Sequence, residues 1–182
     1  MSADRVVAVF GSSAALPDAA EWAEAEKVGA RLAESGYAVV TGGYSGVMEA
    51  VSRGASRAGG RAIGVTAPEL FAARAGANPY VTEERPAGTL TERIGELVGL
   101  ASGIIVLPGS IGTAAELVIA WNLNHVRRNN GGHRIPTVAV GEGWREMWEL
   151  LTSRMGAVGV DIHVVDTASE AVDWLLAQPE IR

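Results

Sequence analysis

The sequence contains no cysteine among its 182 residues, which excludes a disulfide scaffold, thiolate zinc sites, iron–sulfur clusters and a cysteine nucleophile. Lysine occurs only once, as Lys27. A phosphate-binding loop of the G-x-x-x-x-G-K-[ST] type is therefore excluded. Lys27 lies among glutamates in a predicted helix, which makes it a poor candidate for the Schiff base of a pyridoxal phosphate enzyme.

An excess of basic charge and long apolar runs are also missing. The formal net charge is −6, whereas proteins that bind nucleic acids or anionic membranes are normally basic. The apolar runs are only as long as strands, and residues 1–10 are too weakly apolar for a signal peptide. The three histidines are widely separated and share no metal-ligand spacing. We therefore expect a cytoplasmic protein without a nucleic-acid, membrane or metal partner.

The composition is typical of a folded protein, with 48% hydrophobic and 20% charged residues, and apolar runs alternate with amphipathic stretches. The predicted strands are Val6–Phe10, Tyr37–Thr41, Ala62–Thr66, Tyr80–Glu83, Gly103–Leu107, Ile135–Val140 and Ile162–Val165. The predicted helices are Ala19–Glu34, Gly46–Ala58, Leu90–Ala101, Thr113–Arg127, Trp144–Arg154 and Ser169–Ala177, and Ala67–Pro79 is predicted as a loop. Strands that are apolar on both faces are typical of parallel sheets. We expect one α/β domain over residues 1–182, a doubly wound, mostly parallel, Rossmann-like sheet with helices on both faces.

Three glycine-rich turns fall where a predicted strand ends and a helix begins. They are Gly11-Ser12-Ser13, Thr41-Gly42-Gly43-Tyr44-Ser45-Gly46 and Pro108-Gly109-Ser110-Ile111-Gly112-Thr113. At the carboxyl edge of such a sheet, they let backbone N–H groups and helix N-termini approach an anion. One turn alone would be an ordinary connection, but three favour a bound phosphate or nucleotide. NAD(P) is disfavoured, because a strict G-x-G-x-x-G is absent and Val39-Val40-Thr41 carries no ribose-binding acid.

Two charged residues near these turns are candidates for chemistry. Glu116 ends the segment Thr113-Ala114-Ala115-Glu116, which has the pattern of a helix capping box. Glu116 is therefore either a cap or a carboxylate aimed at the sugar of a bound nucleotide. Arg93 lies at the start of an apolar helix, where it is a solvated end residue, a partner for Glu96, or a fork that reaches into the ligand cleft.

Together these residues resemble the Lonely Guy (LOG) family, once mislabelled as lysine decarboxylases. The family signature Pro-Gly-Gly-x-Gly-Thr-x-x-Glu is similar to residues 108–116, with Ser110 in place of a glycine. Phe10-Gly11-Ser12-Ser13 and Gly42-Gly43-Tyr44-Ser45-Gly46-Val47-Met48 resemble two further turns of the family. The family's His-Glu-Arg-Lys element is matched in part by Thr91-Glu92-Arg93-Ile94, and the similarity runs from Val6 to Trp148.

The resemblance implies a Rossmann-like homodimer that hydrolyses the N-glycosidic bond of a nucleoside 5′-monophosphate, a cytokinin riboside 5′-monophosphate or an AMP-like nucleotide. The products are the free base and ribose 5-phosphate, no cofactor is implied, and Arg93 and Glu116 correspond to the catalytic pair. The implied phosphate and nucleotide site consists of Gly11, Ser12, Gly42, Gly43, Gly109, Ser110, Ile111, Gly112 and Thr113. Apolar residues along Leu90–Ala101 and Thr113–Arg127 also favour a homodimer. The alternative is a non-catalytic carrier of a nucleotide or of the molybdenum cofactor.

Overall fold

A computed structural model of the protein describes residues 5–73, 76–155 and 162–181. These residues form a seven-stranded sheet with the strand order β4-β3-β2-β1-β5-β6-β7, in which neighbouring strands are parallel. The strands are β1 (Val6–Phe10), β2 (Ala38–Thr41), β3 (Ala62–Thr66), β4 (Glu83–Pro86), β5 (Gly103–Val106), β6 (Thr137–Val140) and β7 (His163–Val165). The helices are α1 (Ala20–Glu34), α2 (Val47–Arg57), α3 (Leu90–Leu100), α4 (Ile111–Asn129), α5 (Glu142–Met155), α6 (Ala168–Leu176) and the short 3-10 helix η1 (Pro179–Ile181). The predicted Rossmann-like α/β class is confirmed.

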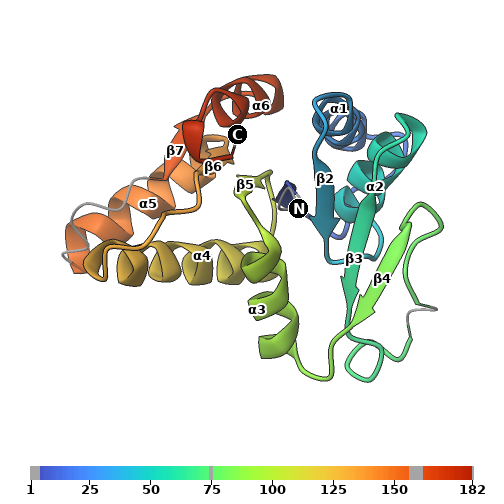
Figure 1. Cartoon of the computed structure of the whole chain (residues 1–182), viewed down its shortest axis with the longest axis horizontal. Coiled ribbons are helices and arrows are strands. Elements are labelled where there is room, and N and C mark those ends of the chain that lie inside the picture. The colour runs from blue at the N-terminus through green and yellow to red at the C-terminus, as the bar shows by residue number, and fades with distance from the viewer. Residues whose placement is uncertain (1–4, 74–75, 156–161, 182) are drawn as a thin grey trace.

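Helices cover both faces of the sheet (Figure 1). α1, α2 and α6 pack on one face against alternate strand residues such as Val7 and Ile105, and α3, α4 and α5 pack on the other against Ala8 and Ile104. Because successive strand residues point to opposite faces, a strand covered on both faces is apolar at every position. No helix in the described ranges has the length and hydropathy needed to cross a bilayer.

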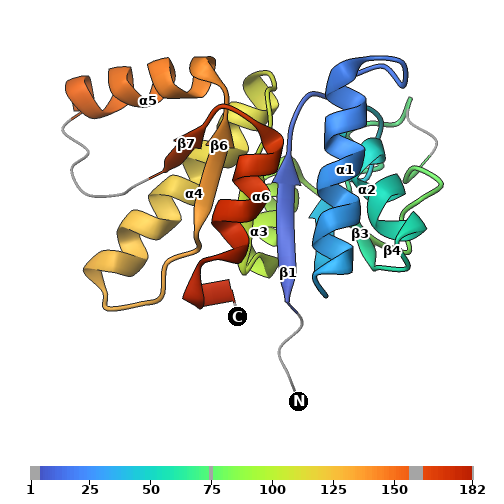
Figure 2. The same cartoon turned by 90° about the horizontal axis from the view of Figure 1, so that it is seen from above.

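The chain changes direction at β1, which determines where a ligand is expected. From β1 the strands proceed outward to β4, and α3 then returns the chain to β5 on the other side of β1. Figure 2 shows β1 between the half that contains α1 and α2 and the half that contains α4 and α5. The connections after β1 and β5 diverge at this switch point, where open α/β sheets bind ligands at the carboxyl edge.

The predicted fourth strand is present, but its predicted bounds Tyr80–Glu83 are wrong, because β4 spans Glu83–Pro86. Its register is fixed by β3, with Ile63 opposite Glu83 and Thr66 opposite Pro86. β4 is an edge strand whose residues alternate between half-buried and exposed. Edge strands carry charge and proline without loss of stability, so β4 lacks the apolar run that identified the inner strands.

Candidate active site

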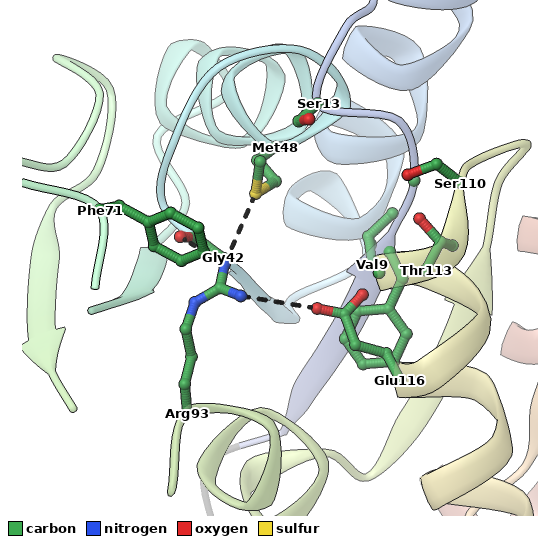
Figure 3. Close-up of a pocket in the computed structure, with 12 residues that line it drawn as sticks. Val9, Ser13, Gly42, Met48, Phe71, Arg93, Ser110, Thr113 and Glu116 are labelled. Carbon is green, nitrogen blue, oxygen red and sulfur yellow. Dashed lines mark hydrogen bonds and ion pairs between the residues drawn. The ribbon is translucent and has the colours of Figure 1, made fainter. Parts of the chain in front are cut away.

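The three glycine-rich turns meet at the crevice beside β1. Ser12 N–H donates to Pro108 O (3.0 Å), and Val47 N–H, at the start of α2, donates to Ser12 O (2.8 Å). These bonds join the turns that follow β1, β2 and β5 into one wall. Beside that wall lies a cavity of about 190 Å³. Its lining residues are Val9, Phe10, Gly11, Ser13, Gly42, Met48, Phe71, Arg93, Ser110, Gly112, Thr113 and Glu116 (Figure 3).

Two glycines of these turns are required by close approach. A Cβ on Gly42 would overlap Arg93 Nη2, and a Cβ on Gly46 would overlap the carbonyl oxygen of Ser12. Gly46 also has φ of 75°, in the left-handed region that favours glycine. The glycines of the second turn therefore allow the first turn and a charged side chain to pack directly against it.

Helix α4 begins three residues earlier than its Thr-x-x-Glu pattern predicts, because that pattern places the N-cap at Thr113. The first helical residue is Ile111, and the N-cap is Ser110, whose side chain makes no capping hydrogen bond. Thr113 lies buried in the first turn, and Glu116 lies in the second. The capping-box interpretation of Glu116 is therefore wrong. The threonine of such a box is the N-cap and must precede the helix, whereas Thr113 lies inside it. The backbone N–H groups of residues 110–113 have no acceptor within the helix, and Ser110, Gly112 and Thr113 line the cavity.

Arg93 enters the cavity from α3, whose start is fixed by a capping box. Glu92 N–H donates to Thr89 Oγ1 (3.2 Å), and Thr89 N–H donates to Glu92 Oε2 (3.0 Å). Arg93 follows directly and is 7% exposed. Its Nε donates to Val65 O (2.8 Å) and its Nη2 donates to Gly42 O (2.9 Å). These carbonyls hold the guanidinium in one orientation at the ends of β3 and β2.

The structure places the Arg93 side chain in the cleft rather than in solvent or beside Glu96. Glu96 Oε1 instead lies 3.5 Å from Arg85 Nη1. The rings of Tyr44 and Phe71 have their centroids 5.7 and 5.8 Å from Arg93 Cζ, within the range of cation–π contacts. The charge of Arg93 is therefore stabilised by carbonyl dipoles and ring faces at a buried position.

Glu116 faces Arg93 across the cavity (Figure 3). Arg93 Nη1 lies 3.9 Å from Glu116 Oε1, and 13% of the Glu116 side chain is exposed. Burial raises the pKa of Glu116 to about 7, and the charge of Arg93 opposes that rise. A carboxyl group that exchanges its proton near neutral pH inside a cavity is suited to acid–base chemistry.

Most residues of the expected site line the cavity, namely Gly11, Gly42, Arg93, Ser110, Gly112, Thr113 and Glu116. The other expected residues, Ser12, Gly43, Gly109 and Ile111, lie in the same turns but do not line it. Ile111 is instead 86% exposed at the start of α4. In the part of the chain that the structure describes, no group of three His, Cys, Asp or Glu side chains could hold a metal ion.

Five cavity residues were not predicted as site residues, namely Val9, Phe10, Ser13, Met48 and Phe71. Phe71 belongs to the predicted loop Ala67–Pro79, which contains no motif. Its ring meets that of Tyr44 edge to face at 5.4 Å, and the Tyr44 hydroxyl accepts a hydrogen bond from Ala67 N–H (2.8 Å). Tyr44 lies in the second glycine-rich turn, so it holds the loop against the site. The signal available in the sequence was a phenylalanine in a Pro/Ala/Gly-rich loop that follows the inner strand β3.

A parallel sheet with glycine-rich turns gathered at its switch point defines the class of Rossmann-like α/β proteins. A sequence model of the SLOG cluster4 family matches residues 4–126, about two thirds of the chain. The chain belongs to this family, and the predicted relation to the LOG proteins is confirmed.

Three named proteins are similar to this chain, two in sequence and one in fold. It is 35% identical over 142 residues to the cytokinin riboside 5′-monophosphate phosphoribohydrolase of Mycobacterium tuberculosis, covering 77% of this chain and 72% of that protein. It is 35% identical over 105 residues to the pyrimidine/purine nucleotide 5′-monophosphate nucleosidase of Escherichia coli, covering 54% of this chain and only 23% of that protein. The solved molybdenum cofactor binding protein of Rippkaea orientalis superposes with a TM-score of 0.77 over 97% of this chain and 98% of that one. At 19% identity, this likeness shows the fold alone.

Proposed function

We propose that the protein hydrolyses the N-glycosidic bond of a nucleoside 5′-monophosphate and releases the free base and ribose 5-phosphate. The names of the Mycobacterium tuberculosis and Escherichia coli relatives support this reaction. The observation that carries the proposal is the arrangement of one cavity: the uncapped N-terminus of α4 lies one helical turn from Glu116, which faces Arg93.

The 5′-phosphate is assigned to the N-terminus of α4. The backbone N–H groups of residues 109–113 and the Thr113 hydroxyl supply donors, and the helix dipole adds a favourable field. Gly11 and Gly42, from the turns after β1 and β2, also line this cavity. Because Glu116 follows Thr113 by about one turn of the same helix, a phosphate at this end brings the ribose toward Glu116.

The proposed reaction passes through an oxocarbenium-like state at C1′. The C1′–N bond breaks, the base leaves with the bonding electrons, and water adds to C1′. Ionised Glu116 stabilises the positive charge and accepts a proton from the attacking water, whose hydroxyl group adds to C1′. The departing base takes a proton from solvent, and Glu116 returns its proton to solvent, so that one water is consumed overall. Two nitrogens of Arg93, Nε and Nη2, are held by carbonyls, and this fixes Nη1 beside Glu116. From this position Arg93 orients Glu116 and reaches the ribose hydroxyls.

We also propose a homodimer that forms through α4. Ile111, Val118, Ile119 and Val126 are exposed, and their spacing places them along one side of this helix. A second copy would cover this apolar stripe. Light scattering at micromolar concentration is expected to show a dimer, Ile119→Glu a monomer, and Leu150→Glu, at an exposed apolar site on α5, an unchanged dimer. A monomeric wild type would contradict the proposal.

Incubation of the pure protein with a panel of nucleoside 5′-monophosphates tests the function, with chromatography for free base and an assay for ribose 5-phosphate. Both products are expected in equal amounts. We also propose that the enzyme is located in the cytoplasm. Tight binding of a nucleotide without base release from any member of the panel would instead support a non-catalytic binding protein, the kind of protein that the name of the Rippkaea orientalis structure describes.

A further inference from the structure

Arg93 is held by two carbonyl groups that differ in how firmly they are fixed. Val65 O belongs to β3, an inner strand with neighbours on both sides. Gly42 O lies just after β2, in a turn that contains two consecutive glycines. Glycine restricts the backbone least, so a Gly-Gly turn needs contacts from outside to keep one conformation. The orientation of Arg93 therefore depends on whatever fixes the Gly42–Gly43 peptide.

Thr41 supplies that contact. The Thr41 Oγ1 atom accepts a hydrogen bond from Gly43 N–H (3.1 Å). This N–H and the Gly42 carbonyl that binds Arg93 Nη2 (2.9 Å) belong to the same planar peptide unit. Because the peptide is rigid, fixing the direction of its N–H also fixes the direction of its C=O. The Thr41 hydroxyl and the Arg93 guanidinium thus hold opposite ends of one rigid unit.

The hydroxyl is itself fixed inside the protein. Thr41 and Ser52 are both fully buried, and their side-chain oxygens are 3.5 Å apart. Ser52 Oγ donates its hydrogen to Met48 O (2.8 Å) on α2. The Ser52 oxygen therefore remains as an acceptor for Thr41. The chain of contacts runs from α2 through Ser52 and Thr41 to the peptide and Arg93.

We propose that Thr41 is a positioning residue: its hydroxyl orients the Gly42–Gly43 peptide so that Gly42 O holds the Arg93 guanidinium against Glu116, an inference that rests on the proposed function of this cavity. Apart from Glu116 itself, Arg93 is the ionisable side chain that lines the cavity in the described residues. The walls from β1, α2 and the N-terminus of α4 contribute groups without charge. A change in the position of Arg93 is therefore expected to change the proton affinity of Glu116.

The experiment compares Thr41→Val, which replaces the hydroxyl by a methyl group of similar size, with Thr41→Ser, which keeps the hydroxyl. Base release by Thr41→Val is expected to fall roughly 10- to 100-fold in kcat with little change in KM, since the phosphate site lies on α4. The rising limb of its pH profile is expected to move to higher pH, because Arg93 no longer favours the Glu116 carboxylate as strongly. Thr41→Ser is expected to restore most of both properties.

Thr137→Val is the matched control. Thr137 is equally buried, and its hydroxyl donates to Ile135 O (3.0 Å) at the start of β6, away from the cavity. It is expected to lower the unfolding temperature as Thr41→Val does, with kcat and the pH profile unchanged. Ser52→Ala is a second variant, used if Thr41→Val does not fold, and is expected to shift the profile in the same direction by less.

A readout without turnover separates this inference from the proposed function. The carboxyl carbon of Glu116, assigned by its loss in Glu116→Gln, is titrated by NMR in the wild type and in both Thr41 variants. A midpoint that rises in Thr41→Val and returns in Thr41→Ser supports the positioning role even if no nucleotide is hydrolysed. An unchanged midpoint in Thr41→Val, or in Ser52→Ala if Thr41→Val does not fold, overturns it whether or not the wild type releases base. Where the wild type does release base, an equal loss of kcat in Thr41→Ser and Thr41→Val overturns it as well.

Discussion

Helices α4 and α6 contain nearly the same four residues near their starts, yet they use them differently. Thr167-Ala168-Ser169-Glu170 forms a complete capping box, in which Glu170 N–H donates to Thr167 Oγ1 (3.2 Å) and Thr167 N–H donates to Glu170 Oε2 (3.0 Å). Thr113-Ala114-Ala115-Glu116 forms no such box, because α4 already begins at Ile111. The α6 segment satisfies its own helix terminus, whereas the α4 segment leaves the terminus open and places a carboxyl group in a cavity.

The comparison separates a structural from a functional use of one pattern. In α6 the capping box satisfies the N–H groups of Thr167 and Glu170, so that end gains stability and has fewer donors to offer an anion. In α4 the same kinds of groups remain available, and Glu116 carries a raised pKa. Open donors and a buried carboxyl lower stability, and proteins keep such features where a site uses them.

The largest expected effect comes from Glu116→Gln compared with Glu170→Gln. Removing the charge of Glu116 is expected to lower turnover roughly 100-fold or more, the usual size of an acid–base contribution. Glutamine also serves in a capping box, so Glu170→Gln is expected to keep wild-type turnover and near wild-type stability. Base release and thermal unfolding are measured on both variants. Wild-type turnover in Glu116→Gln would refute the catalytic assignment.

The pH dependence of stability gives the second effect. The pKa of Glu116 is 4.5 in an unperturbed chain and about 7 in the folded protein, so the folded state binds this proton more tightly. The contribution of Glu116 to the free energy of unfolding is therefore fully present below pH 4.5 and is lost as pH rises to about 7. Glu116→Gln is expected to be stabilised relative to the wild type by up to about 3 kcal/mol more at pH 8 than at pH 4. Denaturant titrations at both pH values check this, and a pH-independent difference would contradict it.

The two threonines are expected to differ in the kind of property that they support. Thr167→Val removes a cap and is expected to lower the free energy of unfolding by about 1 kcal/mol without affecting nucleotide binding. Thr113→Val is expected to change stability less, because Thr113 lies inside the helix, and to weaken AMP binding by removing a donor. Chemical denaturation and calorimetric titration with AMP measure the two properties. Equal loss of stability in both variants would show that Thr113 also caps.

The smallest effect concerns the two glycines of the α4 turn. A Cβ on Gly112 meets no atom within 4 Å, so Gly112→Ala is expected to stabilise the helix by about 0.5–1 kcal/mol while it weakens AMP binding. A Cβ on Gly109 would overlap Thr113 Oγ1, so Gly109→Ala is expected to destabilise the protein. Unchanged AMP affinity in Gly112→Ala would argue against a phosphate at this position.

The sequence was sufficient for the parallel sheet and for the meeting of the three turns, because strands buried on both faces and glycine-rich connections are local signals. It was not sufficient for the start of α4. Thr113 packs against Gly109, and the helix begins at Ile111 although a capping pattern follows two residues later. The position of Phe71 in the cavity was not predicted either, because it depends on contacts of Tyr44 with Phe71 and with Ala67 in the same loop. Local patterns predicted which segments form the site, and tertiary contacts decided which side chains face it.

The most direct test of the open α4 terminus compares adenine release from AMP and from adenosine at equal concentrations. The two compounds share the base and the scissile bond and differ only in the 5′-phosphate assigned to residues 109–113. We expect adenine and ribose 5-phosphate from AMP and release from adenosine that is slower by roughly 100-fold or more, because binding energy at the phosphate positions the ribose against Glu116. Equal rates from AMP and adenosine would contradict the account.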